Sequence, residues 1–104
     1  MAEKKDYSMA KLALKTYNSK LKFCQLRRAA NEPCIDYERE LQFIDDCLAA
    51  IPERDAEVLK AFYIRNIPRI EISEMFYVEH SHIYRMKAKA EERFGELYNT
   101  RGRR

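Results

Sequence analysis

The chain has few residues that bend or break a helix. Among its 104 residues there are two glycines, three prolines and no tryptophan, and its β-branched residues never alternate with polar ones over the length of a strand. Sheets with short hairpins depend on such alternation and on glycine-rich turns. The sequence therefore predicts an all-α protein, with room for one hydrophobic core in a chain of this length.

Other features are missing as well. No apolar run approaches the roughly 18 residues that cross a membrane, and the N-terminus lacks the apolar stretch and cleavage site of a secretory signal. Cys24, Cys34 and Cys47 form no C-x-x-C pair, which favours reduced thiols over a disulfide framework. No phosphate-binding loop and no nucleophile with its base is recognisable. We expect a cytoplasmic protein without enzyme activity, cofactor, metal or membrane partner.

The charges are unevenly distributed along the chain. Residues 1–30 contain eight basic and two acidic side chains, residues 31–58 two and nine, and residues 59–104 ten and six. The net charge of +3 therefore conceals an acidic middle between two basic segments. Because long-range fields and the choice of partner follow local clusters, this distribution matters more than the net charge.

Apolar spacing divides the chain into five predicted helices, at about residues 7–30, 34–50, 51–66, 68–76 and 80–97. The first two form an N-terminal helix pair within residues 1–50, antiparallel because their connection is short. The other three form a second unit over residues 51–98. A basic tail, residues 99–104, lacks apolar residues and is expected to be disordered.

The predicted first helix carries two apolar stripes. One repeats in steps of three and four through Tyr7, Ala10, Leu14, Tyr17, Leu21 and Cys24, and beside it lie Met9, Leu12, Phe23 and Leu26. The combined face is broader than one partner helix covers. Two interpretations stay open: the helix packs across the rest of its own domain, or it also meets a second copy of the chain in a homodimer.

Residues 69–86 have the pattern that two crossing helices with a shared core require. Counted from Arg69, the fifth residue, Ser73, is small where the helices come closest. Apolar residues occupy the fourth, eighth, tenth, fifteenth and eighteenth positions, which are Ile72, Phe76, Val78, Ile83 and Met86. The 3.6-residue period then turns a polar and basic face of the second helix outward, formed by Ser81, Tyr84, Arg85, Ala88 and Lys89. Such a face fits the major groove of DNA.

From Ile51 to about Leu97 the chain resembles region 4 of the bacterial sigma-70 family and its phage relatives. IPERDAEVLKAFYI resembles the family's leucine-proline opening, and EISEMFYVEHSHIYRMKAKAEERF resembles its Glu-Ile-Ala turn, corner and recognition helix. The N-terminal helices and the total length are similar to those of small phage transcriptional regulators of the ArpU and RinA kind. The family usually has Gly at the corner, where this chain has Tyr77, and no segment resembles the sigma region that melts promoter DNA.

The resemblance implies a sigma-70 region 4-like helix-turn-helix that binds double-stranded DNA sequence-specifically and regulates phage or prophage transcription. The residues implied to face the bases are His80, Ser81, His82, Tyr84, Arg85 and Lys89. Those expected on phosphates are Arg65, Arg69, Lys87 and Arg93, with Arg101, Arg103 and Arg104 in the tail. His80 and His82 lie about 200° apart on a helix and do not chelate one ion together.

An alternative function is kept open by the acidic middle segment. A sigma-like helical adaptor would bind RNA polymerase or another regulator without itself reading DNA. A titration with duplex DNA distinguishes the two functions, because a protein with several phosphate contacts binds DNA in a salt-dependent way and an adaptor does not bind it.

Overall fold

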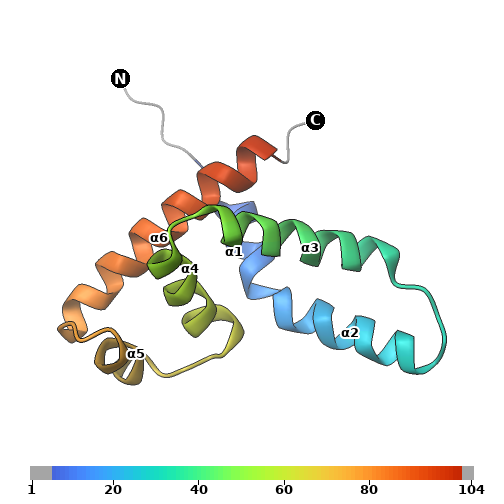
Figure 1. The fold of residues 1–104 in the computed structure, drawn as a ribbon, viewed down its shortest axis with the longest axis horizontal. Coiled ribbons are helices and arrows are strands. Elements are labelled where there is room, and N and C mark those ends of the chain that lie inside the picture. Colours follow the sequence, from blue (N-terminus) through green and yellow to red (C-terminus); the bar gives the residue numbers. More distant parts are fainter. Residues whose placement is uncertain (1–5, 102–104) are drawn as a thin grey trace.

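The computed structural model describes residues 6–101, and within them it contains helices and no strand. The helices are α1 (Ser8–Lys15), α2 (Tyr17–Ala29), α3 (Ile35–Ala50), α4 (Glu53–Leu59), the π-helical turn η1 (Lys60–Ile64), α5 (Arg69–Met75) and α6 (His80–Arg101), as Figure 1 shows. The predicted all-α fold class is confirmed. The molecule is flat, 46 × 38 × 19 Å, because the α2–α3 hairpin and the α5–α6 corner extend in different directions from the central helices (Figure 1).

The single helix predicted over residues 7–30 is two helices, with a bend at Thr16. The Thr16 hydroxyl and the Thr16 N–H each donate to the Leu12 carbonyl oxygen at 2.9 Å. A threonine that bonds back to the preceding turn bends a helix. As a result α1 packs against α6 while α2 turns away to pair with α3 (Figure 1).

Helices α1, α3, α4 and α6 enclose the main core. Its buried side chains are Ala10, Ala13, Leu14, Ile44, Cys47, Leu48, Ile51, Ala56, Leu59, Ala90 and Phe94. The Tyr7 ring lies directly on Gly95 of α6, at a distance that leaves no room for a Cβ. Gly95 is required there by this close approach rather than by a turn.

Helices α2 and α3 form the predicted antiparallel pair, which projects from the main core as a hairpin (Figure 1). Opposite charges pair across it, Lys20 with Glu40 at 2.6 Å and Arg28 with Glu38 at 3.1 Å. Each pair has at least one exposed member, so each contributes well under ~1 kcal/mol and packing must hold the hairpin.

The packing inside the hairpin is a small cluster of its own, formed by Cys24, Cys34 and Leu41. Tyr17 packs against this cluster and against the main core, and its hydroxyl donates to Asp45 at 2.8 Å. Burial and this hydrogen bond raise the pKa of Tyr17 to about 12. Tyr17 therefore joins the hairpin to the body in its neutral form.

Two helices of the second unit end at other residues than predicted. The third predicted helix continues from α4 as η1, in which the Arg65 N–H donates to the Lys60 carbonyl at 2.7 Å. Asn66 then adopts a left-handed backbone, with φ 51°, and ends it. At the other end α6 runs on to Arg101, so the prediction of disorder from Asn99 is wrong for residues 99–101. Arg103 and Arg104 lie outside the described residues.

Candidate nucleic-acid interface

The chain turns sharply between α5 and α6, as predicted. The Val78 N–H donates to the Ser73 carbonyl at 3.0 Å and the Tyr77 N–H to the Glu74 carbonyl at 3.2 Å. This pair of hydrogen bonds closes a helix around one residue in the left-handed conformation, which is usually glycine. Here that residue is Tyr77, with φ 56°. The corner thus has the usual left-handed geometry without the usual residue.

A shared interior holds the two helices together. Ile72 of α5 and Ile83 of α6 are fully buried against Ala61 of η1. Around them pack Phe62, Ile67, Phe76, Val78 and Met86. All five apolar positions predicted from the spacing after Arg69 therefore meet in one cluster.

Ser73, the small residue predicted where α5 and α6 come closest, lies in the protein interior. It is fully buried, and its hydroxyl donates to the Ile70 carbonyl at 2.7 Å, which satisfies the hydroxyl within α5. A larger side chain at this position would push α5 and α6 apart.

The opposite side of α6 is exposed. Ser81, Arg85 and Lys89 follow one another at intervals of four residues and form a stripe along the helix. In the part of the chain that the structure describes, neither Arg85 nor Lys89 has an ion-pair partner. His80 and His82 are also exposed, at the positively polarised first turn of α6. These side chains are free to meet an anion.

Arg69 and Tyr84 bind each other beside this stripe. The Arg69 Nη1 donates to the Tyr84 hydroxyl at 2.6 Å, and the guanidinium lies 4.9 Å from the centre of the ring. A cation over an aromatic face at this distance is stabilised even at an exposed site. The pair holds the charge at the start of α5 next to the outward face of α6.

Lys87 lies elsewhere on α6. It follows Ile83 by one turn, next to the buried side, and its ammonium lies 4.8 Å from the Phe62 ring centre and 5.3 Å from that of Tyr63. The Tyr63 hydroxyl in turn donates to Glu91 of α6, and burial together with this bond raises the pKa of Tyr63. These contacts fix η1 on α6 and draw Lys87 away from the face of Arg85.

Two other predicted phosphate contacts have acidic partners within the chain. Arg93 pairs with Asp55 of α4 at 2.5 Å, and this hydrogen-bonded carboxylate raises the pKa of Arg93. Arg65 lies 3.5 Å from Glu57. The structure therefore brings together Arg69, Tyr84 and the exposed stripe of α6, and it does not place Lys87 or Arg93 with them.

Sequence reasoning missed a contact that supports the corner. Arg54 of α4 donates to the Phe76 carbonyl at 3.4 Å and lies 5.6 Å from the centre of the Phe76 ring. No periodicity connects positions 22 residues apart in different helices.

An acidic residue ends the basic stripe of α6. Glu92 is exposed and follows Arg85 by two turns on the same side. It limits the basic part of the stripe to the first half of α6.

Comparison of the chain with known proteins finds no relative. No family model, no curated protein and no solved structure matches the chain. Over residues 6–101, no group of three or more His, Cys, Asp or Glu side chains is arranged to hold a metal ion. None of the helices in this range combines the length and the apolar character needed to cross a bilayer.

The left-handed backbone at Tyr77 gives a prediction about stability. The Tyr77 side chain is 96% exposed, so little packing compensates for the roughly 1 kcal/mol that a side chain costs in this conformation. We expect Tyr77→Gly to raise the free energy of unfolding by about 0.5–1 kcal/mol, measured by urea denaturation.

Tyr77→Ala is the matched control for this substitution. It removes the same ring but keeps a Cβ, so the backbone strain remains and we expect no increase in the free energy of unfolding. A Tyr77→Gly variant that is less stable than Tyr77→Ala would contradict the left-handed corner.

Proposed function

We propose that this chain binds double-stranded DNA sequence-specifically and regulates transcription, with α6 in the major groove. The observation that carries the proposal is the exposed stripe Ser81, Arg85 and Lys89, on a helix whose other side is packed against α5. An α-helix with side chains is about 10–12 Å across, and the major groove of B-DNA is about 12 Å wide. Helix α6 thus exposes this stripe in the same way as a recognition helix exposes the side chains that contact bases.

Within this proposal the side chains divide by position. Arg85 is the best candidate for a guanine, whose two acceptors suit a guanidinium. His80, Ser81, His82 and Lys89 contact neighbouring bases or phosphates. Arg69, held by Tyr84, contacts the backbone beside the groove. Lys87, Arg93 and Arg65 are assigned no contact, because aromatic rings, Asp55 and Glu57 respectively already engage them.

The resemblance of residues 51–97 to region 4 of the sigma-70 family supports the same assignment. The residues that carry it include the corner and the whole outward stripe of α6. It also points to a phage or prophage regulator as the setting of the proposed activity.

The proposal is tested with duplex fragments selected from a random pool, titrated at two salt concentrations. If four phosphates are neutralised, affinity falls about a hundredfold between 50 and 200 mM salt, on the order expected from counterion release. Arg85→Ala is expected to cost ~1–3 kcal/mol on the selected site, about 5- to 150-fold in Kd. Fluorescence anisotropy measures both.

Lys22→Ala provides the charge-matched control. Lys22 is an exposed lysine on α2, so its loss removes one positive charge from the hairpin and leaves α6 unchanged. We expect its affinity to match the wild type. Equal losses in the two variants would mean that only net charge matters and would contradict groove recognition by Arg85.

A sigma-like adaptor for RNA polymerase or another regulator is the second candidate function. The observation that favours it is the acidic surface of α3, where Asp36, Glu40 and Asp46 are exposed. An adaptor would show no binding to duplex DNA at either salt concentration, so the same titration distinguishes the two functions.

We also propose that the chain forms a homodimer through its N-terminal helices. Met9 and Leu12 of α1 remain exposed, and so do Leu21, Phe23 and Leu26 of α2. Exposed apolar side chains that gather in a patch are typical of protein contacts, and the proposal is that the dimer covers those of α1 and α2. A two-fold dimer predicts an inverted repeat as the DNA site.

Sedimentation equilibrium at tens of micromolar tests the dimer. We expect twice the chain mass of 12.5 kDa, and a single chain mass for Leu12→Glu/Leu26→Glu. A wild-type protein that remains a monomer at this concentration would contradict the dimer, and it would leave DNA binding by α6 untouched.

A further inference from the structure

The α2–α3 hairpin holds two thiols side by side. Cys24 lies in α2 and Cys34 directly precedes α3, and their sulfur atoms are 2.6 Å apart. The two residues are 3% and 8% exposed and form the hairpin's own cluster with Leu41. A disulfide bond needs about 2.05 Å between the sulfurs, so only a small movement separates these free thiols from a covalent bond.

We propose that Cys24 and Cys34 are a modification site that closes reversibly into a disulfide and fastens α2 to the start of α3. The pairing is specific, because Cys47, the remaining cysteine, is fully buried in the main core and belongs to a different cluster. The proposal does not depend on the proposed DNA binding.

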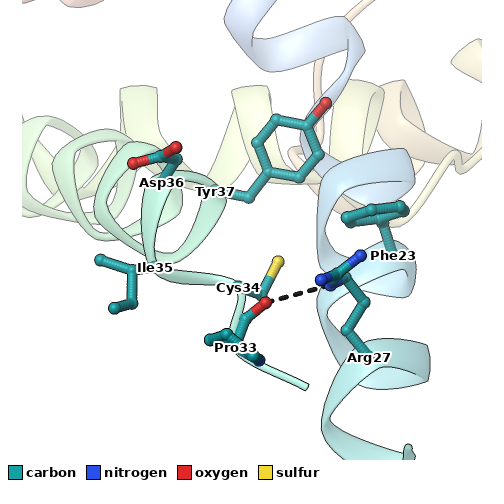
Figure 2. Close-up of a pocket in the computed structure, with 7 residues that line it drawn as sticks. All are labelled: Phe23, Arg27, Pro33, Cys34, Ile35, Asp36 and Tyr37. Carbon is teal, nitrogen blue, oxygen red and sulfur yellow. Dashed lines mark hydrogen bonds between the residues drawn. The ribbon is translucent and has the colours of Figure 1, made fainter.

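Each cysteine of the pair lies in the wall of a surface hollow, which is the path that we propose for a small oxidant. Cys34 lies in the wall of an open hollow of about 580 Å³. Figure 2 shows its sulfur directed toward the side on which the rings of Phe23 and Tyr37 lie. Arg27 donates to the Pro33 carbonyl at 3.0 Å and so holds the connecting turn in place (Figure 2). Cys24 lies in the wall of a second, smaller hollow between α2 and α3, of about 320 Å³. The pair is buried from bulk solvent yet close to the surface on two sides.

A peroxide is the class of oxidant that fits this path. The Cys34 sulfur attacks one peroxide oxygen, the O–O bond breaks, and a sulfenic acid and one water form. The Cys24 sulfur then attacks the sulfenic sulfur, the S–S bond forms, and the hydroxyl leaves as a second water with the remaining thiol proton. Two thiols and one hydrogen peroxide thus give one disulfide and two waters, and a dithiol reverses the bond by exchange.

The hairpin also sets the speed of this reaction. Burial raises the pKa of the Cys24 thiol, and the neighbouring Cys34 sulfur raises it further. Because the thiolate is the nucleophile, the second step, in which the Cys24 sulfur attacks, becomes faster as the pH rises.

Closure has a measurable effect on stability. The bond joins residues 24 and 34 and removes conformational freedom from the unfolded chain. For a loop of this length in a domain of this size, the midpoint of thermal unfolding should rise by on the order of 10 °C.

Peptide mapping of the folded full-length chain tests the site. The protein is treated with hydrogen peroxide, alkylated with N-ethylmaleimide in denaturant and digested with trypsin, which places the three cysteines in separate peptides, residues 23–27, 29–39 and 40–54. We expect the first two peptides joined and two hydrogens lighter, with Cys47 alkylated. Dithiothreitol before alkylation should return all three peptides in alkylated form.

Two controls make the result decisive. Cys47→Ser should keep the cross-link, and Cys24→Ser should lose both the cross-link and the rise in the unfolding midpoint. Three alkylated thiols after oxidation of the folded wild type would overturn the proposal, and so would cross-links to Cys47 as frequent as those between Cys24 and Cys34. Both outcomes are read from the wild type alone, so they hold even if a variant fails to fold.

Discussion

The left-handed backbone at Tyr77 is the constraint on which the proposed DNA-binding face depends. Without it, α5 and α6 would continue as one rod, on which Ile72 and Ile83 would lie about 16 Å apart. With the turn, both reach the same side of Ala61 and close a common interior. The helical period then leaves Arg85 and Lys89 directed toward solvent. One residue in an unfavourable conformation thus determines which side of α6 is available to a partner.

The corner and its interior could be predicted from the sequence, because apolar residues at fixed positions after Arg69 leave few other ways to pack. The conformation of Tyr77 could not, since tyrosine rarely adopts it and only the packing on both sides imposes it. The bend at Thr16 was hidden because the apolar stripes continue across it. The position of Lys87 near the buried side of α6 could be predicted from the helical period, since Lys87 follows the apolar Ile83 by one turn. The ion pair of Arg93 could not be predicted, because its partner Asp55 lies 38 residues away in the sequence.

Helix α6 links the parts of the molecule. Its first turns contribute Ile83 to the corner, and its later turns contribute Ala90 and Phe94 to the main core, which α1 and α3 share. The α2–α3 hairpin has a second cluster, formed by Cys24, Cys34 and Leu41, and it joins the body through Tyr17, through the Asn18 amide, which donates to the Ile64 carbonyl, and through the core residues of α3. This arrangement places the proposed DNA contacts and the proposed disulfide in different packing units (Figure 1).

The most direct measurement of the central claim is a titration of the ¹⁵N-labelled chain with a selected DNA duplex, followed by amide NMR. Presentation of α6 by the corner predicts that the largest shifts fall on residues 80–89 and Arg69, while Asp36, Glu40 and Asp46 on α3 stay unchanged. Shifts concentrated on α3, or no shifts at all, would contradict it.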